Sequence, residues 1–171
     1  MRVWAGPSLV AVALLLVSGA LKARPPSAVR AGSHRSSGPL ARLAPAVGIA
    51  ELVVALGALT VDNRILPALA GTLYLAFSVF VALALTAEEP VADCGCFGAA
   101  ETTPTPMHLV LNLGAAAACG AVAWQSGGTL VRAVEGQPLL GLPLLLLTGI
   151  CVFLAYAALT VAPRARAVAG T

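Results

Sequence analysis

The chain has 171 residues, of which 59% are hydrophobic and only 10% are charged. Soluble domains carry roughly 25% charged residues, so this composition excludes a soluble globular domain. The net charge of +3 is small, and no run of Lys and Arg with interleaved aromatic residues indicates nucleic-acid binding. The composition instead predicts an all-α polytopic helical bundle that lies in a membrane.

Five apolar runs are close to the length that a helix needs to cross a bilayer. A hydrocarbon core about 30 Å thick requires roughly 20 apolar residues, and backbone groups in lipid must be satisfied within the helix. We therefore expect one integral membrane domain, with a tight turn at 62–64 that makes the second and third helices an antiparallel hairpin. The predicted spans are residues 3–21, 43–61, 65–87, 108–125 and 139–162.

The first run also fits a second interpretation. Arg2, a short apolar stretch and the small residues at 18–20 are typical of a signal peptide with its cleavage site. Cleavage there would leave four spans in place of five. We take five spans as the prediction.

The loops between the runs differ in charge, which bears on topology. Residues 22–42 hold Lys and Arg but no acid, whereas residues 88–107 hold acids but neither Lys nor Arg. With five spans, both loops and the C-terminus share one side of the cell membrane. That side holds most of the Lys and Arg and is cytoplasmic by the positive-inside rule. Stable disulfides favour the oxidising side instead, so the side of the second loop stays open.

The sharpest motif is Asp93-Cys94-Gly95-Cys96-Phe97-Gly98, within the second loop. Two cysteines separated by one residue can come within disulfide distance, and the resulting small ring is strained. A strained disulfide is more easily reduced, which is typical of labile or catalytic pairs. Gly95 gives the backbone the freedom that this closure requires. We therefore predict a redox-active pair.

Two other interpretations of Cys94 and Cys96 stay open. They are an inert thiol pair, or half of a metal site with His108; the spacing matches no recognisable zinc motif, so we expect no metal. The acidic residues around the pair disfavour the thiolate. A cation from the loop at 22–42, or His108 as a proton donor or acceptor, would have to compensate.

Glu51 lies near the middle of the second predicted span, where an ionisable group is expensive and usually faces the bundle interior. It is either a proton relay or contact for a buried partner, or a structural hydrogen-bonding group, with Asn112 as a candidate partner. Asn112 lies one helical turn after His108, on the same face. Lys22 ends the first span and is either a supporting residue of the site or a long cationic side chain that snorkels to the interface.

The remaining chemically reactive or amphipathic residues have simpler interpretations. Cys119 and Cys151 lie in apolar runs, where free cysteine behaves as a small hydrophobe. Trp4 and Trp124 fall near predicted span ends and are typical of interfacial aromatic belts.

Four places in the chain resemble the MauE methylamine-utilisation membrane proteins, within the broader DoxX-like group. The most specific is Cys94-Gly95-Cys96-Phe97-Gly98. The other three are weaker one by one: residues 18–22, residues 49–52 followed by Gly57, and residues 108–112. The resemblance covers roughly residues 8–125. Leu111 departs from it, because the family often has Arg directly before the Asn.

This resemblance implies a DoxX-like four-helix core, followed here by a fifth C-terminal helix. It also implies a role in maturing a disulfide-rich partner, with a thioredoxin-fold protein as companion. Our leading hypothesis is a membrane thiol–disulfide redox protein in which Cys94 and Cys96 cycle, with Glu51, His108 and Asn112 lining the bundle nearby. A quinone in the bilayer is a candidate electron acceptor. The alternatives are a non-catalytic scaffold subunit and a small proton-coupled transporter that uses Glu51.

Overall fold

The structure of the chain is a computed structural model that describes residues 3–23, 39–87, 104–125, 130–135 and 138–169. Every regular element in these ranges is a helix. In chain order the elements are α1 (Ala5–Lys22), α2 (Pro39–Thr60), α3 (Ile65–Thr86), α4 (Pro106–Trp124), α5 (Leu130–Glu135), the short 3-10 helix η2 (Pro138–Gly141) and α6 (Leu142–Ala169).

Five helices in the described part of the chain are long and apolar enough to cross a membrane. Their apolar stretches are Ala5–Lys22, Leu43–Thr60, Ile65–Thr86, Pro106–Trp124 and Leu142–Thr160. The predicted all-α polytopic fold is therefore confirmed. The short connection between α2 and α3 also confirms the predicted hairpin.

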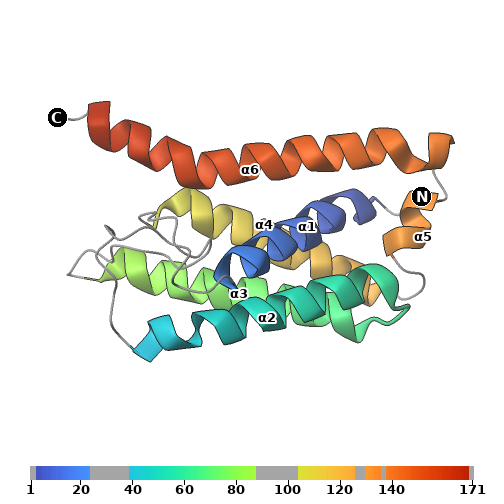
Figure 1. Cartoon of the computed structure of the whole chain (residues 1–171), viewed down its shortest axis with the longest axis horizontal. Helices are drawn as coiled ribbons and strands as arrows, with labels where there is room; N and C mark the ends of the chain where they lie inside the picture. Colours follow the sequence, from blue (N-terminus) through green and yellow to red (C-terminus); the bar gives the residue numbers. More distant parts are fainter. Residues whose placement is uncertain (1–2, 24–38, 88–103, 126–129, 136–137, 170–171) are drawn as a thin grey trace.

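Helices α1 to α4 form an antiparallel bundle, and α6 lies along its outside against α1 (Figure 1). Within the bundle, α3 packs most extensively on α4, and α1 on α2. At one end, called the Lys22 end below, α1 and α3 stop while α2 and α4 begin. At the other, called the Arg64 end, α2 and α4 stop while α1 and α3 begin.

The core of the bundle combines large residues from α1 with small ones from its neighbours. Leu9, Val12 and Leu15 recur every three residues on one face of α1 and are almost fully buried. Opposite them, the other helices contribute mainly alanines: Ala55, Ala58, Ala70 and Ala116. Small residues let helix backbones approach closely, which matters in lipid because packing rather than water exclusion holds transmembrane helices together.

Two buried hydrogen bonds connect α1 to α3 and α4. The Tyr74 hydroxyl on α3 donates to the Ala11 carbonyl at 2.6 Å, and the Ser8 hydroxyl donates to the Ala118 carbonyl on α4 at 2.8 Å. Both donors are side chains that would be unsatisfied in hydrocarbon without such a partner. Because α1 makes both bonds and supplies the large core residues, it is an integral part of the packed bundle.

The segment between α4 and α6 is more structured than the sequence indicated. It contains α5, whose Leu130 is 4% exposed and joins the bundle core. The chain then turns sharply through η2, where Gly141 has φ +72° and a side chain would meet Val134 at 2.5 Å. The final helix begins at Leu142 and extends to Ala169, beyond the predicted end at residue 162.

Candidate functional site

The site begins with a close contact between the backbones of α1 and α2. A Cβ atom added to Gly19 would lie 2.7 Å from the Gly48 carbonyl oxygen, and one added to Gly48 would lie 2.8 Å from the Gly19 carbonyl oxygen. Real Cβ atoms do not approach that closely, so glycine is required on both helices. Lys22 and Glu51 each follow one of these glycines by three residues, one helical turn further on. The crossing therefore brings the two charged side chains together.

Lys22 and Glu51 form a buried ion pair. The Lys22 Nζ donates to Glu51 Oε1, and the two side chains are 3% and 0% exposed. The second carboxylate oxygen, Oε2, accepts a hydrogen bond of 2.7 Å from the Ser18 hydroxyl. A lone charge at this depth is strongly unfavourable, and pairing together with hydrogen bonding compensates for the lost hydration.

Helix α3 adds an aromatic wall to this ion pair. Lys22 Nζ lies 4.6 Å from the centre of the Phe77 ring, a distance at which the negative face of the ring attracts a cation. Phe77 in turn meets Tyr74 edge to face, with ring centres 6.3 Å apart. The ammonium group is thus held by a carboxylate from α2 and a ring from α3. The prediction that Lys22 snorkels to the interface is wrong, because a close partner one helix away holds it inside.

His108 lies in the first turn of α4 and is 1% exposed. Its Nδ1 accepts from the Thr105 backbone N–H at 3.3 Å and lies 2.8 Å from the Thr105 hydroxyl oxygen. An imidazole whose Nδ1 accepts carries its proton on Nε2 when it is neutral. The buried Nε2 has no hydrogen-bond partner. His108 therefore presents an unused donor inside the protein.

Asn112, one turn further along α4, is also buried, and its Nδ2 likewise has no partner. The candidate hydrogen bond from Asn112 to Glu51 is not formed, since Asn112 Nδ2 has no partner, and the carboxylate oxygens of Glu51 accept from Lys22 and Ser18 instead. The sequence predicted that His108 and Asn112 share a face of the helix, and both are buried. Together they offer two N–H donors, one helical turn apart, that an oxygen atom of a ligand or a water molecule could accept.

Four of the predicted site residues belong to the Lys22 end and the bundle interior next to it: Lys22, Glu51, His108 and Asn112. Cys94 and Cys96 lie outside the described residues. The segment that holds them, residues 88–103, joins α3 to α4, and both of those helix ends lie at the Lys22 end. The chain connection alone thus attaches the Cys-Gly-Cys segment to the end that carries the buried polar side chains.

Ser18 is the member of this cluster that the sequence reasoning did not single out as a functional residue. The available signal was its spacing: Ser18 and Lys22 lie four residues apart and so share a face of α1. A second signal was the repeat of glycine followed three residues later by a charge, at Gly19 and again at Gly48.

The isolated cysteines and the tryptophans lie away from this cluster. Cys119 is free and fully buried, and Cys151 is free and half-buried, in line with their interpretation as small hydrophobes. Trp4 and Trp124 flank α1 and α4 at the Arg64 end and are 42% and 90% exposed. Among the described residues, no three His, Cys, Asp or Glu side chains gather in a way that could hold a metal ion.

Residues 2–125 match the family described as Methylamine utilisation protein MauE. The matched range contains α1 to α4, the Lys22–Glu51 pair and the Cys-Gly-Cys segment, and it ends one residue after α4. No curated protein and no solved structure matches the chain.

Proposed function

The chain belongs to the MauE family, and we propose that it is a membrane thiol–disulfide redox protein that serves methylamine utilisation by assisting disulfide formation in a partner protein. The proposal rests on one observation, which is that the cysteine segment and the buried polar groups belong to the same end of the bundle. The segment with Cys94 and Cys96 is attached to the same end of the bundle as the buried Lys22–Glu51 pair and the unused donor of His108. Buried ionisable groups within membrane spans are functional candidates by default.

The proposed reaction is thiol–disulfide exchange at Cys94 and Cys96. A thiolate of the partner attacks the Cys94–Cys96 disulfide and forms a mixed disulfide, which releases one of the two cysteines as a thiol. The second partner thiolate then attacks the mixed disulfide and leaves with a disulfide of its own. The partner loses two electrons and two protons, and Cys94 and Cys96 gain them as two thiols.

Renewed turnover needs an acceptor for two electrons and two protons, and a quinone dissolved in the bilayer is the class of molecule that we propose. His108 and Asn112 support this choice, because their free N–H groups are the donors that a carbonyl oxygen accepts. An acceptor held there would lie at the Lys22 end, to which the Cys-Gly-Cys segment is attached.

Lys22, Glu51 and Ser18 have a positioning role in this proposal. Their three side chains satisfy one another and fix α1 against α2 at the Gly19–Gly48 crossing. A proton-coupled transporter that uses Glu51 is less well supported, because a carboxylate that must pick up and release a proton is here bonded at both oxygens. A scaffold subunit is compatible with the same fully paired arrangement, and the cysteines distinguish it from a redox protein.

The proposed partner is a thioredoxin-fold protein at the surface of the cell membrane. The chain would act as a multi-pass membrane component that exchanges electrons with this companion, which in turn oxidises the substrate protein. The oxidising side of the membrane is where the exchange would yield stable disulfides.

The test uses the full-length protein in lipid nanodiscs, with reduced thioredoxin as donor and a short-chain quinone as acceptor. We expect thioredoxin thiols to disappear with the wild-type protein, and oxidation to be abolished in Cys94→Ser and in Cys96→Ser. Cys151→Ser is the matched control and should retain the wild-type rate, since Cys151 lies within α6. Equal oxidation rates in all variants would contradict the redox proposal and favour a scaffold.

A further inference from the structure

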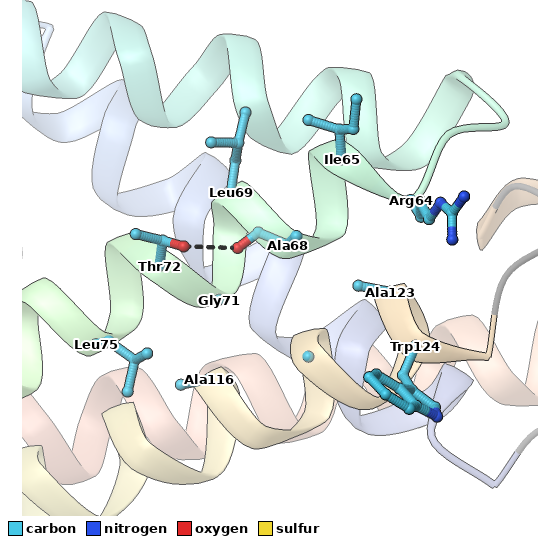
Figure 2. Close-up of a pocket in the computed structure, with 11 residues that line it drawn as sticks. Arg64, Ile65, Ala68, Leu69, Gly71, Thr72, Leu75, Ala116, Ala123 and Trp124 are labelled. Carbon is cyan, nitrogen blue, oxygen red and sulfur yellow. Dashed lines mark hydrogen bonds between the residues drawn. The ribbon is translucent and has the colours of Figure 1, made fainter.

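A groove of about 680 Å³ lies between α3 and α4 and opens at the Arg64 end of the bundle (Figure 2). Its floor is made of small residues, among them Gly71, Ala116 and Gly120. The α3 and α4 backbones meet there, since a Cβ added to Gly71 would lie 3.3 Å from the Ala116 carbonyl oxygen. Gly120 faces open space, with nothing within 4 Å of an added Cβ. Volumes of roughly 300–1,000 Å³ are typical of ligand sites.

The groove is apolar along most of its length and charged at one end. Thr72 is the polar side chain along its wall, and its hydroxyl is used within α3, where it donates to the Ala68 carbonyl at 3.0 Å. Figure 2 shows Arg64 and Trp124 at one end of the groove and Leu75 at the other. The occupant must therefore be an apolar body with a polar group at one end only.

The charged end has the composition of a membrane interface. Arg64 is exposed at the start of α3, and the first turn of that helix contains no acidic residue. Trp124 ends α4 and is 90% exposed, as expected of an indole at the level of lipid headgroups. Asp62 lies in the same turn as Arg64. Even beside this carboxylate, the planar Arg64 guanidinium can bind phosphate with two parallel hydrogen bonds, and its positive charge favours a lipid with a net negative headgroup over a zwitterionic lipid that carries the same phosphate.

The length of the groove matches one leaflet of a bilayer. Residues 64 to 75 span eleven helical steps, or about 16 Å at the rise of an α-helix. Half of a hydrocarbon core that is about 30 Å thick is close to this length. A transmembrane helix from a second protein is longer than the groove. An acyl chain needs only the distance from the headgroup to the bilayer midplane.

We propose that this groove binds one anionic phospholipid, with its phosphate on the Arg64 guanidinium, its glycerol region beside Trp124 and an acyl chain along the small-residue floor as far as Leu75. Basic positions at the ends of grooves between transmembrane helices are suited to such headgroups. The site lies at the Arg64 end and is independent of the redox proposal at the Lys22 end.

Trp124 serves as its own reporter in the test. In a Trp4→Phe background, Trp124 is the remaining tryptophan of the chain, and lipids brominated on the acyl chain quench its fluorescence on contact. The full-length protein is placed in vesicles of phosphatidylcholine with a graded fraction of brominated phosphatidylglycerol, or of brominated phosphatidylcholine. We expect phosphatidylglycerol to associate about fivefold more strongly, the size of effect that one cation near an anionic surface gives.

Variants separate the headgroup from the acyl chain. Arg64→Gln should reduce the fivefold preference to about one, while Arg64→Lys should retain part of it. Gly120→Leu fills the groove and should remove the preference for phosphatidylglycerol, and Ala68→Leu on the opposite wall tests the same point in case the first variant does not fold. Gly114→Leu is the matched control, because Gly114 also faces open space on α4 but lies outside the groove.

Four results would overturn the proposal. Equal quenching by both brominated lipids, or a preference that survives Arg64→Gln, would show that Arg64 selects no headgroup. Complete competition by millimolar inorganic phosphate would show an ion site without a lipid. Crosslinking of two copies through residues 68 and 120, with Trp124 shielded from both lipids, would show that a second copy covers the groove.

Discussion

The two ends of the bundle use small residues in opposite ways. At the Lys22 end, Gly19 and Gly48 bring α1 and α2 into backbone contact, and that contact closes the polar cluster around Glu51. At the Arg64 end, Gly120 and its neighbours leave a furrow open between α3 and α4. A glycine in a membrane helix thus allows close backbone approach at Gly19 and Gly48 and leaves open space at Gly120.

The difference also separates two kinds of polar side chain. Lys22 and Glu51 are buried and satisfy each other inside the bundle, whereas Arg64 is exposed at its edge. The first arrangement organises the protein internally, and the second is available to a molecule from outside. Substitutions at the two ends should therefore differ in their effect on stability.

The largest effect is expected from breaking the ion pair. Glu51→Leu leaves the Lys22 ammonium buried without a counter-charge, and Lys22→Met does the same to the carboxylate. Each should lower the free energy of unfolding by about 3–5 kcal/mol, measured by denaturant titration of the purified protein in detergent with helical circular dichroism as the signal. The double variant Lys22→Met/Glu51→Leu should recover most of the loss. Equal destabilisation in single and double variants would contradict a stabilising pair.

A smaller effect should distinguish the two uses of glycine directly. Gly48→Ala places a methyl group 2.7 Å from Lys22 Cβ and should lower the unfolding free energy by about 1–3 kcal/mol, because the helices must separate. Gly120→Ala points into open space and should be neutral or slightly stabilising, since alanine is the better helix former. The comparison of the two ends is wrong if both substitutions have the same effect in the same denaturant titration.

The smallest effect concerns the hydrogen bonds that hold α1 in the bundle. Ser8→Ala removes the bond to the Ala118 carbonyl and should lower the unfolding free energy by about 0.6 kcal/mol, the average for such bonds between membrane helices. Thr72→Ala is the control, because its hydroxyl bonds within its own helix and is exposed to the groove. If the melting temperatures of the two variants differ by less than the replicate error, the Ser8 hydrogen bond does not stabilise the bundle.

Much of the fold could be predicted from the sequence because the membrane imposes it. Apolar runs of about 20 residues have few alternatives in lipid, so the five long helices and the hairpin with its turn at 62–64 were predictable. Helix α5 was not, because six residues give too short a pattern for helical periodicity to appear. The local sign of a helix was the spacing of four between Leu130 and Val134. That spacing is informative only once the core against which both residues pack is known.

The site was predictable residue by residue but not in its pairing. Glu51 was recognised as a buried polar group from its place in an apolar run, and His108 and Asn112 were expected to share a helix face that lines the bundle. The partner of Glu51 was not, because the contact between α1 and α2 depends on the point where two helices cross. The residue pattern of one helix does not show where a second helix crosses it. Lys22, at a helix end, is also explained equally well as a snorkelling residue. The repeated spacing from Gly19 to Lys22 and from Gly48 to Glu51 is the feature that points to the pair.

We propose that thiol–disulfide exchange takes place at the Lys22 end of the bundle, through Cys94 and Cys96. The most direct test of this redox role is to label the full-length protein with a membrane-impermeant maleimide, before and after reduction. The labelling is done both in intact cells and in opened vesicles. The account predicts two labels, at Cys94 and Cys96, that appear only after reduction and are absent from the Cys94→Ser/Cys96→Ser variant. The preparation in which they appear also identifies the side of the membrane. Labelling of both cysteines without reduction would contradict a resting disulfide and with it the proposed oxidation of a partner.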